Sequence, residues 1–195
     1  MPADARGFTM LEVLVAILVV TLGLLGLAGL QTVGLRNNTS SAQRTIATQL
    51  AYDMADRMRA NWAGVLSGDY DYRNYNDRLD GRTIAAAPKG ANTANCATAT
   101  GCNSQQLAYE DLWEWNQQIC AQLPQNTACS GGTAAAFWGV VCLDSTPNDG
   151  DPTGATPDPH CDGLANSPYV IKIWWIEDRA NAALPLKQWV TTFVP

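Results

Sequence analysis

Residues 7–35 read GFTMLEVLVAILVVTLGLLGLAGLQTVGL, and this stretch decides how the rest of the chain is organised. After Glu12 it carries no charged side chain from Val13 to Leu35, a run of 23 residues. At about 1.5 Å per residue the run makes a helix of roughly 35 Å, which exceeds the ~30 Å hydrocarbon core of a bilayer. The sequence therefore predicts a helix that occupies a membrane at some stage.

Three kinds of N-terminal segment would explain this run: a cleaved secretory signal, a permanent anchor, or a short leader followed by a membrane-resident helix. A secretory signal is disfavoured because Asp4 offsets Arg6 before the run, and because the run is too long. Its nearest approach to a small-residue cut site is Leu27–Gly29. Glu12 needs a partner or an interfacial position, because a carboxylate inside an apolar helix costs about 2.5–3.5 kcal/mol even on insertion-derived scales.

The segment GFTMLEVLVA, residues 7–16, resembles the class III signal of type IV pilins and type II secretion pseudopilins. In that family an inner-membrane aspartyl protease, prepilin peptidase, cuts after the glycine and methylates the new N-terminal phenylalanine. The resemblance implies cleavage between Gly7 and Phe8, N-methylation of Phe8, and the role of the family glutamate for Glu12. The leader is less basic than usual, and Gly29 stands where many major pilins have a helix-kinking proline.

Two later segments, LGLLGLAGLQ at residues 22–31 and MADRMRAN at residues 54–61, resemble minor pilins of the PilV group, the pilus counterpart of the pseudopilin GspI. This resemblance implies a leader over residues 1–7, a transmembrane or filament-core helix over 8–35, and a periplasmic or extracellular head over 36–195. It also implies the α+β pilin fold, in which a long N-terminal helix packs on a small antiparallel sheet in a disulfide-bonded head.

The function that the resemblance implies is that of a minor pilin, which primes assembly and resides in the tip complex of a fimbrium used in twitching motility and cell adhesion. The head would be periplasmic while the helix lies in the inner membrane, and extracellular after assembly. The implied partners are other minor pilins, the major pilin, prepilin peptidase, the inner-membrane assembly platform and, as a further candidate, a tip adhesin. A GspI-like type II secretion pseudopilin and an adhesin that binds a surface ligand are the alternatives.

Cleavage after Gly7 would give every subunit a cationic amino terminus. In a filament core shielded from water, Glu12 of one subunit could pair with the Phe8 amine of a neighbour. Such a pair would offset the cost of burying the carboxylate and set the axial register.

The head has the composition of an exported, disulfide-bonded domain. None of its cysteines forms the C-x-x-C pair of zinc or thioredoxin-like sites, so their even number indicates disulfides and an oxidising compartment. Six cysteines allow 15 pairings, and sequential pairing is our expectation. The pairs would be Cys96 with Cys102, Cys120 with Cys129, and Cys142 with Cys161.

Charge and histidine content exclude several functions. The net charge is −6, and no Lys or Arg occurs from Gly90 to Ile171, so a nucleic-acid surface is excluded. His160 is the single histidine, and it lies in a Pro- and Asp-rich loop beside a cysteine expected to be oxidised. A nucleophilic enzyme that used His160 as its base is therefore disfavoured, and we expect neither catalysis nor a cofactor.

Two polar segments carry candidate binding residues. The segment 144–167 holds five aspartates and could bind Ca²⁺, but its spacing is not that of an EF-hand, so a solvated acidic loop without a metal ion is preferred. His160 beside Cys161 also suggests a metal ligand, with a chance surface position as the preferred reading. The tyrosine-rich segment 67–77 is predicted to be an exposed loop, available for contacts or packed back on the sheet.

Hydrophobic periodicity predicts the elements of the head. An amphipathic helix continues the membrane helix to about residue 61, with apolar residues every four positions. These are Ala42, Ile46, Leu50, Met54 and Met58, beside Ala47, Ala51 and Ala55. A second helix is expected from an N-cap at Ser104 to a stop at Pro124, with an apolar stripe of Leu107, Leu112, Trp115, Ile119 and Leu123. Residues 136–143, 169–176 and 188–194 read as strands, the last two as an antiparallel pair.

Overall fold

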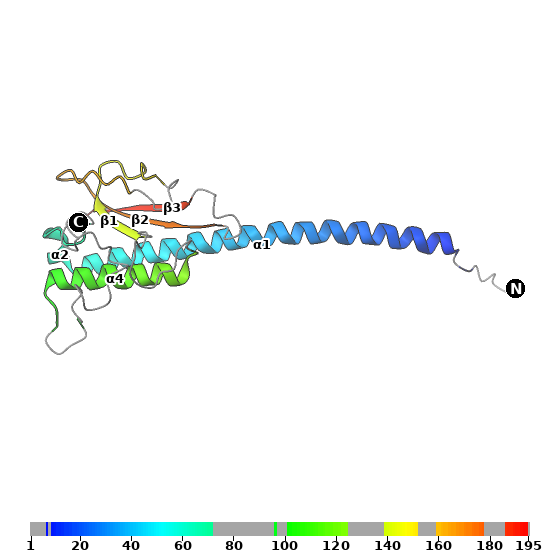
Figure 1. Cartoon of the computed structure of the whole chain (residues 1–195), viewed down its shortest axis with the longest axis horizontal. Helices are drawn as coiled ribbons and strands as arrows, with labels where there is room; N and C mark the ends of the chain where they lie inside the picture. The colour runs from blue at the N-terminus through cyan, green and yellow to red at the C-terminus, as the bar shows by residue number, and fades with distance from the viewer. Residues whose placement is uncertain are drawn as a thin grey trace, which may run out of the picture. The chain divides into compact units, whose positions relative to one another are not determined.

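The computed structural model describes residues 7, 9–71, 96, 101–124, 139–151, 159–177 and 186–194 (Figure 1). Its elements are α1 (Met10–Ala60), α2 (Trp62–Leu66), α4 (Ser104–Gln122), β1 (Gly139–Leu143), β2 (Tyr169–Trp175) and β3 (Lys187–Phe193). They form two compact units, Met1–Ala42 and Gln43–Pro195. A long N-terminal helix, a small antiparallel sheet and disulfides confirm the predicted α+β pilin fold.

Helix α1 is continuous over 51 residues, as the combined run of apolar and amphipathic segments predicts. Within the second unit its buried residues are Gln43, Ala47, Leu50, Ala51, Met54, Ala55 and Met58. The predicted stripe is wrong at its first position, since Ala42 is exposed and its neighbour Gln43 is buried instead. A 3.6-residue period drifts from a strict four-residue repeat, so the buried face moves by one residue along its length.

Helix α4 (Ser104–Gln122) starts one residue earlier than expected. Asn103, and not Ser104, is the N-cap, and it forms a capping box with Gln106 in which each side chain accepts from the other residue's backbone N–H. The helix ends at Gln122, two residues before Pro124. Its predicted apolar stripe is confirmed, with Leu112, Trp115, Ile119 and Leu123 buried and Leu107 half-buried.

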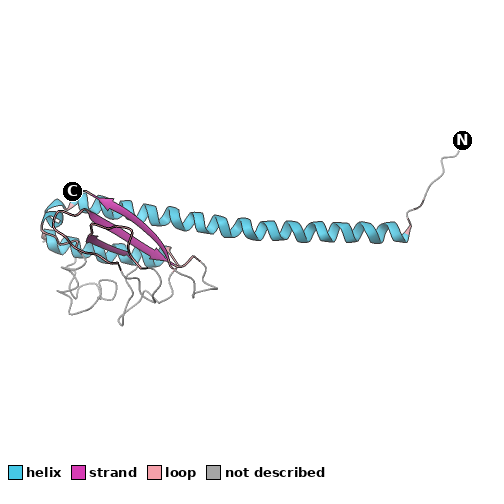
Figure 2. Ribbon diagram, turned by 90° about the horizontal axis from the view of Figure 1, so that it is seen from above, coloured by secondary structure: helices cyan, strands magenta, loops and turns pink. Residues whose placement is uncertain are grey.

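Trp115 joins the three layers of the head. Its ring is fully buried and its indole N–H donates to the carbonyl of Leu50 in α1 at 2.8 Å. Gly139 of β1 packs against the same ring, because a Cβ built there would lie 2.5 Å from Trp115 and 2.3 Å from Ile119. Figure 2 shows the two helices running along the sheet. Glycine at 139 is thus what lets β1 approach α4.

The described sheet has three antiparallel strands in the order β1-β2-β3. In its register Gly139 pairs with Ile173 and Ile173 with Trp189, so this row faces the helices. The next row, Val140, Lys172 and Val190, therefore points to the opposite face. The predicted strand pair β2–β3 is confirmed, whereas residues 136–138 of the predicted first strand lie outside the described residues.

The prediction of an exposed loop over residues 67–77 holds at Ser67, which is exposed, and is wrong at residues 69–71, which are buried. Tyr70 is fully buried, and its hydroxyl donates to Asp111 Oδ2 of α4 at 2.5 Å while accepting from Asn61 Nδ2 at 3.2 Å. Arg57 holds the other oxygen of Asp111 at 3.2 Å and also pairs with Asp53. This network ties α1 to α4, and residues 72–77 of the segment lie outside the described residues.

Burial raises the pKa of several titratable side chains in this part of the head. For the Tyr70 hydroxyl, burial is the main cause, and the hydrogen bond to Asp111 raises the pKa further. Burial also raises the pKa of Asp111 against the opposing effects of Tyr70 and Arg57. Tyr169, whose hydroxyl donates to the carbonyl of Val65 at 2.9 Å, has its pKa raised to about 12, chiefly by burial and then by two nearby carboxylates.

The close approach at Gly139 can be tested by adding one methyl group. Gly139→Ala places a Cβ inside the contact distance of Trp115 and Ile119, so overpacking should lower the free energy of unfolding by about 1–3 kcal/mol. Urea unfolding of the full chain in detergent, followed by tryptophan fluorescence, measures this. Gly34→Ala is the matched control, because no atom lies within 4 Å of its Cβ position. Equal midpoints for the two variants would contradict the packing described.

The buried tyrosines predict loss of stability at alkaline pH. The pKa of a tyrosine in the unfolded chain is about 10, and these tyrosines have a higher pKa in the folded protein. Each therefore adds to the free energy of unfolding in full below pH 10. This contribution is lost as the pH rises through the folded pKa, at up to about 1.4 kcal/mol per pH unit. For Tyr169 that window runs to about 12. Tyr169→Phe should therefore reduce the fall in urea midpoint between about pH 9 and pH 11. Tyr52→Phe, at an exposed position, should not, and an unchanged slope in Tyr169→Phe would refute this assignment.

Candidate processing and assembly site

The start of α1 is fixed by Thr9. The Glu12 backbone N–H donates to the Thr9 carbonyl at 3.1 Å and to the Thr9 hydroxyl oxygen at 3.3 Å, so Thr9 caps a helix that begins at Met10. Thr9 and Glu12 have the Thr-x-x-Glu spacing of a capping box. The carboxylate of Glu12 also lies in the first turn, where the helix dipole favours negative charge.

The expected cut site precedes this cap. Gly7 is exposed and has no atom within 4 Å of its Cβ position, whereas Phe8 lies outside the described residues. Helix α1 begins at Met10, three residues after Gly7.

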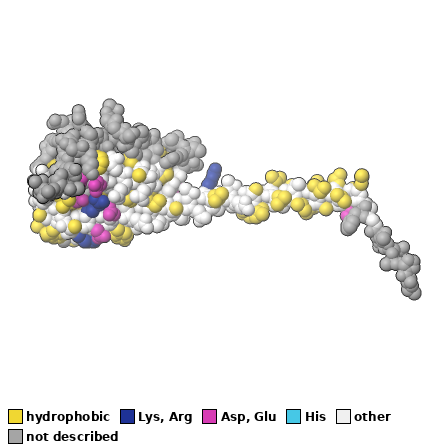
Figure 3. All heavy atoms as spheres, turned by 90° about the horizontal axis from the view of Figure 1, so that it is seen from below, with side chains coloured by type: hydrophobic (Ala, Val, Ile, Leu, Met, Phe, Trp, Pro, Cys, Tyr) yellow, Lys and Arg dark blue, Asp and Glu magenta, His cyan; other side chains and the backbone are white. Residues whose placement is uncertain are grey.

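The first unit exposes apolar side chains along the whole of its helix. Figure 3 shows them on one face of the molecule. Exposed fractions range from 49% at Val13 to 94% at Met10. Helix α1 is long and apolar enough to cross a membrane, and none of its most apolar window is buried within the chain. One such helix near an N-terminus is a weak indication by itself, but here it coincides with the capped start described above.

Three threonine hydroxyls of this helix form hydrogen bonds within the helix. The hydroxyls of Thr21, Thr32 and Thr39 donate to the carbonyls of Leu18, Ala28 and Leu35 at 2.7–3.0 Å. The glycines at 23, 26, 29 and 34 have no neighbour within 4 Å of their Cβ positions. Among the residues that the structure describes, no contact requires glycine at these positions. A hydrocarbon environment accepts such a helix, because its backbone and hydroxyl donors are already paired.

The described cysteines all lie in the second unit and are disulfide-bonded. Cys96–Cys102 and Cys142–Cys161 are disulfides, two of the three expected pairs, with Cα–Cα distances of 5.0 and 6.1 Å. Cys120 is also disulfide-bonded, and its expected partner Cys129 lies outside the described residues. No described cysteine is free.

Three carboxylates of the aspartate-rich segment form ion pairs or hydrogen bonds with other residues of the head. Asp144 and Asp149 bind Lys172, and both oxygens of Asp162 accept hydrogen bonds, one from Ser145 and one from the backbone of Leu164. The Thr146 hydroxyl, and after it Lys172, lowers the pKa of Asp149. Among the described residues no group of three or more His, Cys, Asp or Glu side chains is placed to hold a metal ion. His160 is exposed, with φ at 48°.

Sequence reasoning missed the buried pair of Lys172 and Asp144, both with no exposed side-chain surface. The available signal was a single cation within the strand YVIKIWW, which is otherwise apolar or aromatic. A charge at the centre of such a strand is almost never fully buried unless it is paired. Its partner, however, follows a different strand and could not be found from spacing.

Comparison with known proteins bears on the N-terminal segment. Residues 3–28 match the family model described as the prokaryotic N-terminal methylation motif. No curated protein and no solved structure matches the chain. Proteins with this motif are structural pilins, which are generally not enzymes, and the motif with its apolar helix fits inner-membrane anchoring followed by pilus assembly. The match therefore supports a type IV pilin-like protein, a pilin or pseudopilin substrate of prepilin peptidase.

Proposed function

We propose that this chain is a minor pilin of a type IV pilus. Prepilin peptidase cuts it between Gly7 and Phe8, and Phe8 becomes the methylated N-terminus. Residues 8–35 then form a transmembrane and later filament-core helix, and residues 36–195 form the head. In keeping with its PilV-like segments, the protein primes assembly with other minor pilins and resides at the pilus tip.

One observation carries this proposal: the methylation motif over residues 3–28 leads into a helix whose most apolar window contains no buried residue in the part of the chain that the structure describes. Burying apolar surface yields about 25 cal/mol per Å², so a helix with this surface requires lipid or other helices around it. A pilin has both in turn, the inner membrane before assembly and neighbouring subunits afterwards. The major pilin, the other minor pilins and the membrane assembly platform are thus the partners that we propose.

Glu12 gives this helix its register in the proposed filament. Moving the helix from a bilayer into a filament core leaves its apolar side chains in apolar surroundings, but the carboxylate needs a cation. Cleavage supplies one on each subunit, the Phe8 amine. We assign Glu12 to pair with the Phe8 amine of a neighbouring subunit, in addition to its place in the first turn of its own helix.

Processing at Gly7 is tested by a bulky replacement. Gly7→Leu should leave the leader attached, because the side chain occupies the place where the peptidase reads glycine. Intact mass of the membrane-bound protein reports the leader directly. Gly34→Leu, at another position with open space around it, should be cut normally. Efficient cleavage of Gly7→Leu would remove the case for this processing site.

The charge of Glu12 can be separated from its capping role. Glu12→Gln keeps a side chain that can complete a capping box but removes the negative charge, so the variant should insert into the membrane and be cut. It should reach sheared filaments at least about tenfold less, a difference of ~1.4 kcal/mol or more. The filament-to-membrane ratio from quantitative immunoblots measures this.

Glu12→Asp retains the charge and is the matched control, which should recover part of the incorporation. Normal incorporation of Glu12→Gln would refute the ion pair. Equal loss in both variants would assign Glu12 to shape or capping alone.

A further inference from the structure

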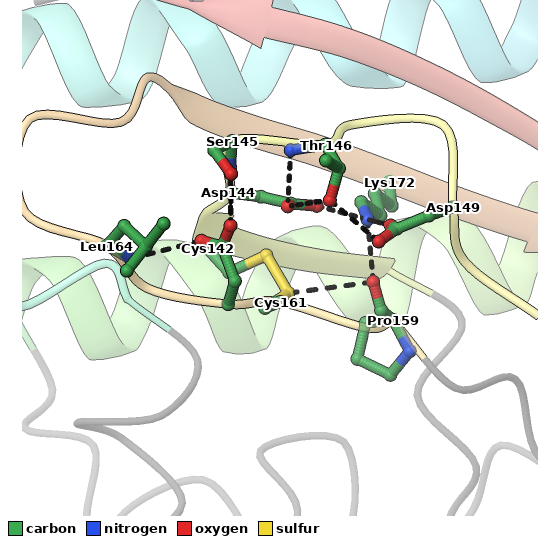
Figure 4. Close-up of polar contacts among 10 residues, drawn as sticks. Cys142, Asp144, Ser145, Thr146, Asp149, Pro159, Cys161, Leu164 and Lys172 are labelled. Carbon is green, nitrogen blue, oxygen red and sulfur yellow. Dashed lines mark hydrogen bonds and ion pairs between the residues drawn. A yellow bond between two sulfur atoms is a disulfide. The ribbon is translucent and has the colours of Figure 1, made fainter.

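Lys172 is a fully buried cation with a complete set of acceptors. Its ammonium donates to Asp144 Oδ2 at 2.5 Å, to the carbonyl of Pro159 at 2.6 Å and to Asp149 Oδ1 at 3.4 Å. Figure 4 shows these contacts converging from one side of β2. An ammonium has three donors, so the site is matched to the charged form of lysine.

Those acceptors come from two segments that cover the face of the sheet opposite the helices. The first arm, residues 144–149, follows β1 and supplies both carboxylates; the second arm, residues 159–164, supplies the Pro159 carbonyl. Within the described residues the second arm is held to β1 by the Cys142–Cys161 disulfide and by the Gly163 N–H, which donates to the Leu143 carbonyl at 2.9 Å. Asp162 joins it to Ser145 of the first arm at an exposed position.

Closing the second arm over Lys172 carries an electrostatic cost. Burying an ammonium costs several kcal/mol, and only complete pairing offsets this. With the arm open, water would solvate Lys172, whereas an apolar residue at this position would favour the closed arm. The hydrogen bonds of the arm are few, and each of them contributes little compared with a covalent bond. The Cys142–Cys161 disulfide is therefore the strongest contact that keeps the second arm closed against the hydration of Lys172.

We propose that Lys172 makes docking of the second arm conditional on oxidation of Cys142 and Cys161. The two thiols lose two protons and two electrons to a disulfide of an exchange partner, which is reduced to two thiols, and the new S–S bond holds Pro159 over the ammonium. In a reducing compartment the arm stays open and Lys172 stays hydrated. In the oxidising compartment proposed above, the head is completed.

Amine reactivity of Lys172 tests this inference in the full-length protein in detergent. Cys142→Ser/Cys161→Ser should raise the rate of acylation of Lys172 by acetic acid N-hydroxysuccinimide ester at least about tenfold, which corresponds to ~1.4 kcal/mol of opening. Cys96→Ser/Cys102→Ser is the matched control and should leave Lys172 protected. Lys187, half-exposed in the same chain, is the internal reference in peptide mass spectrometry. A Lys172 that stays protected without its disulfide would overturn the proposal.

A charge-free pair separates this inference from simple unfolding of the cysteine variant. Lys172→Met/Asp144→Asn removes both charges, and asparagine keeps an acceptor for the Thr146 N–H. In the Cys142→Ser/Cys161→Ser background this pair should restore slow hydrogen exchange at the Gly163 N–H, which marks the docked arm. Equally fast exchange with and without the charges would show that Lys172 does not oppose docking, and the proposal would fail.

Discussion

Between Val13 and Leu35 the side chains of α1 are uncharged, mostly apolar and exposed, and none of the most apolar window of this helix is buried among the described residues. Its backbone donors are paired within the helix, and three of its threonine hydroxyls bond back to preceding carbonyls. Such a segment is stable in hydrocarbon or among other apolar helices, and unstable in water. The methylation motif overlaps the start of this segment, and a disulfide-bonded head follows it.

The head is built to hold the amphipathic part of the same helix. Trp115 fills the space between α1, α4 and β1, with its polar edge bonded to Leu50 and its ring against Gly139. Arg57, Asp111 and Tyr70 then fix α4 along α1 at a second point. One face of the sheet is occupied in this way, and the opposite face is covered by the arms that surround Lys172.

Helices and strands could be predicted wherever the periodicity of apolar residues in the sequence matches the side chains that are buried in the structure. The charge-free run, the stripe of α4 and the β2–β3 pair each repeat one period over several residues, so a single exception does not change the assignment. The cap at Asn103 differs from the expected Ser104 because both residues accept backbone hydrogen bonds equally well, and only the path of the preceding chain selects between them.

Parts that depend on distant contacts could not be predicted. Tyr70 lies in a polar segment that resembles a surface loop, yet its hydroxyl finds Asp111 across 41 positions. Lys172 and Asp144 are likewise joined only when β1 and β2 pair. In the candidate site, Gly7 and Glu12 could be selected from the sequence because a processing signal is a contiguous stretch of residues. The proposed partner of Glu12 lies on another subunit, so no pattern in this chain identifies their contact.

We infer that this chain is processed, oxidised and assembled. The non-reduced intact mass of the protein from sheared surface filaments, compared with that of the protein from membranes, tests all three steps at once. We expect a filament species that lacks residues 1–7, carries one added methyl group and has lost the thiol hydrogens of all six cysteines. Full-length protein confined to membranes, or a cut near Gly29, would contradict it.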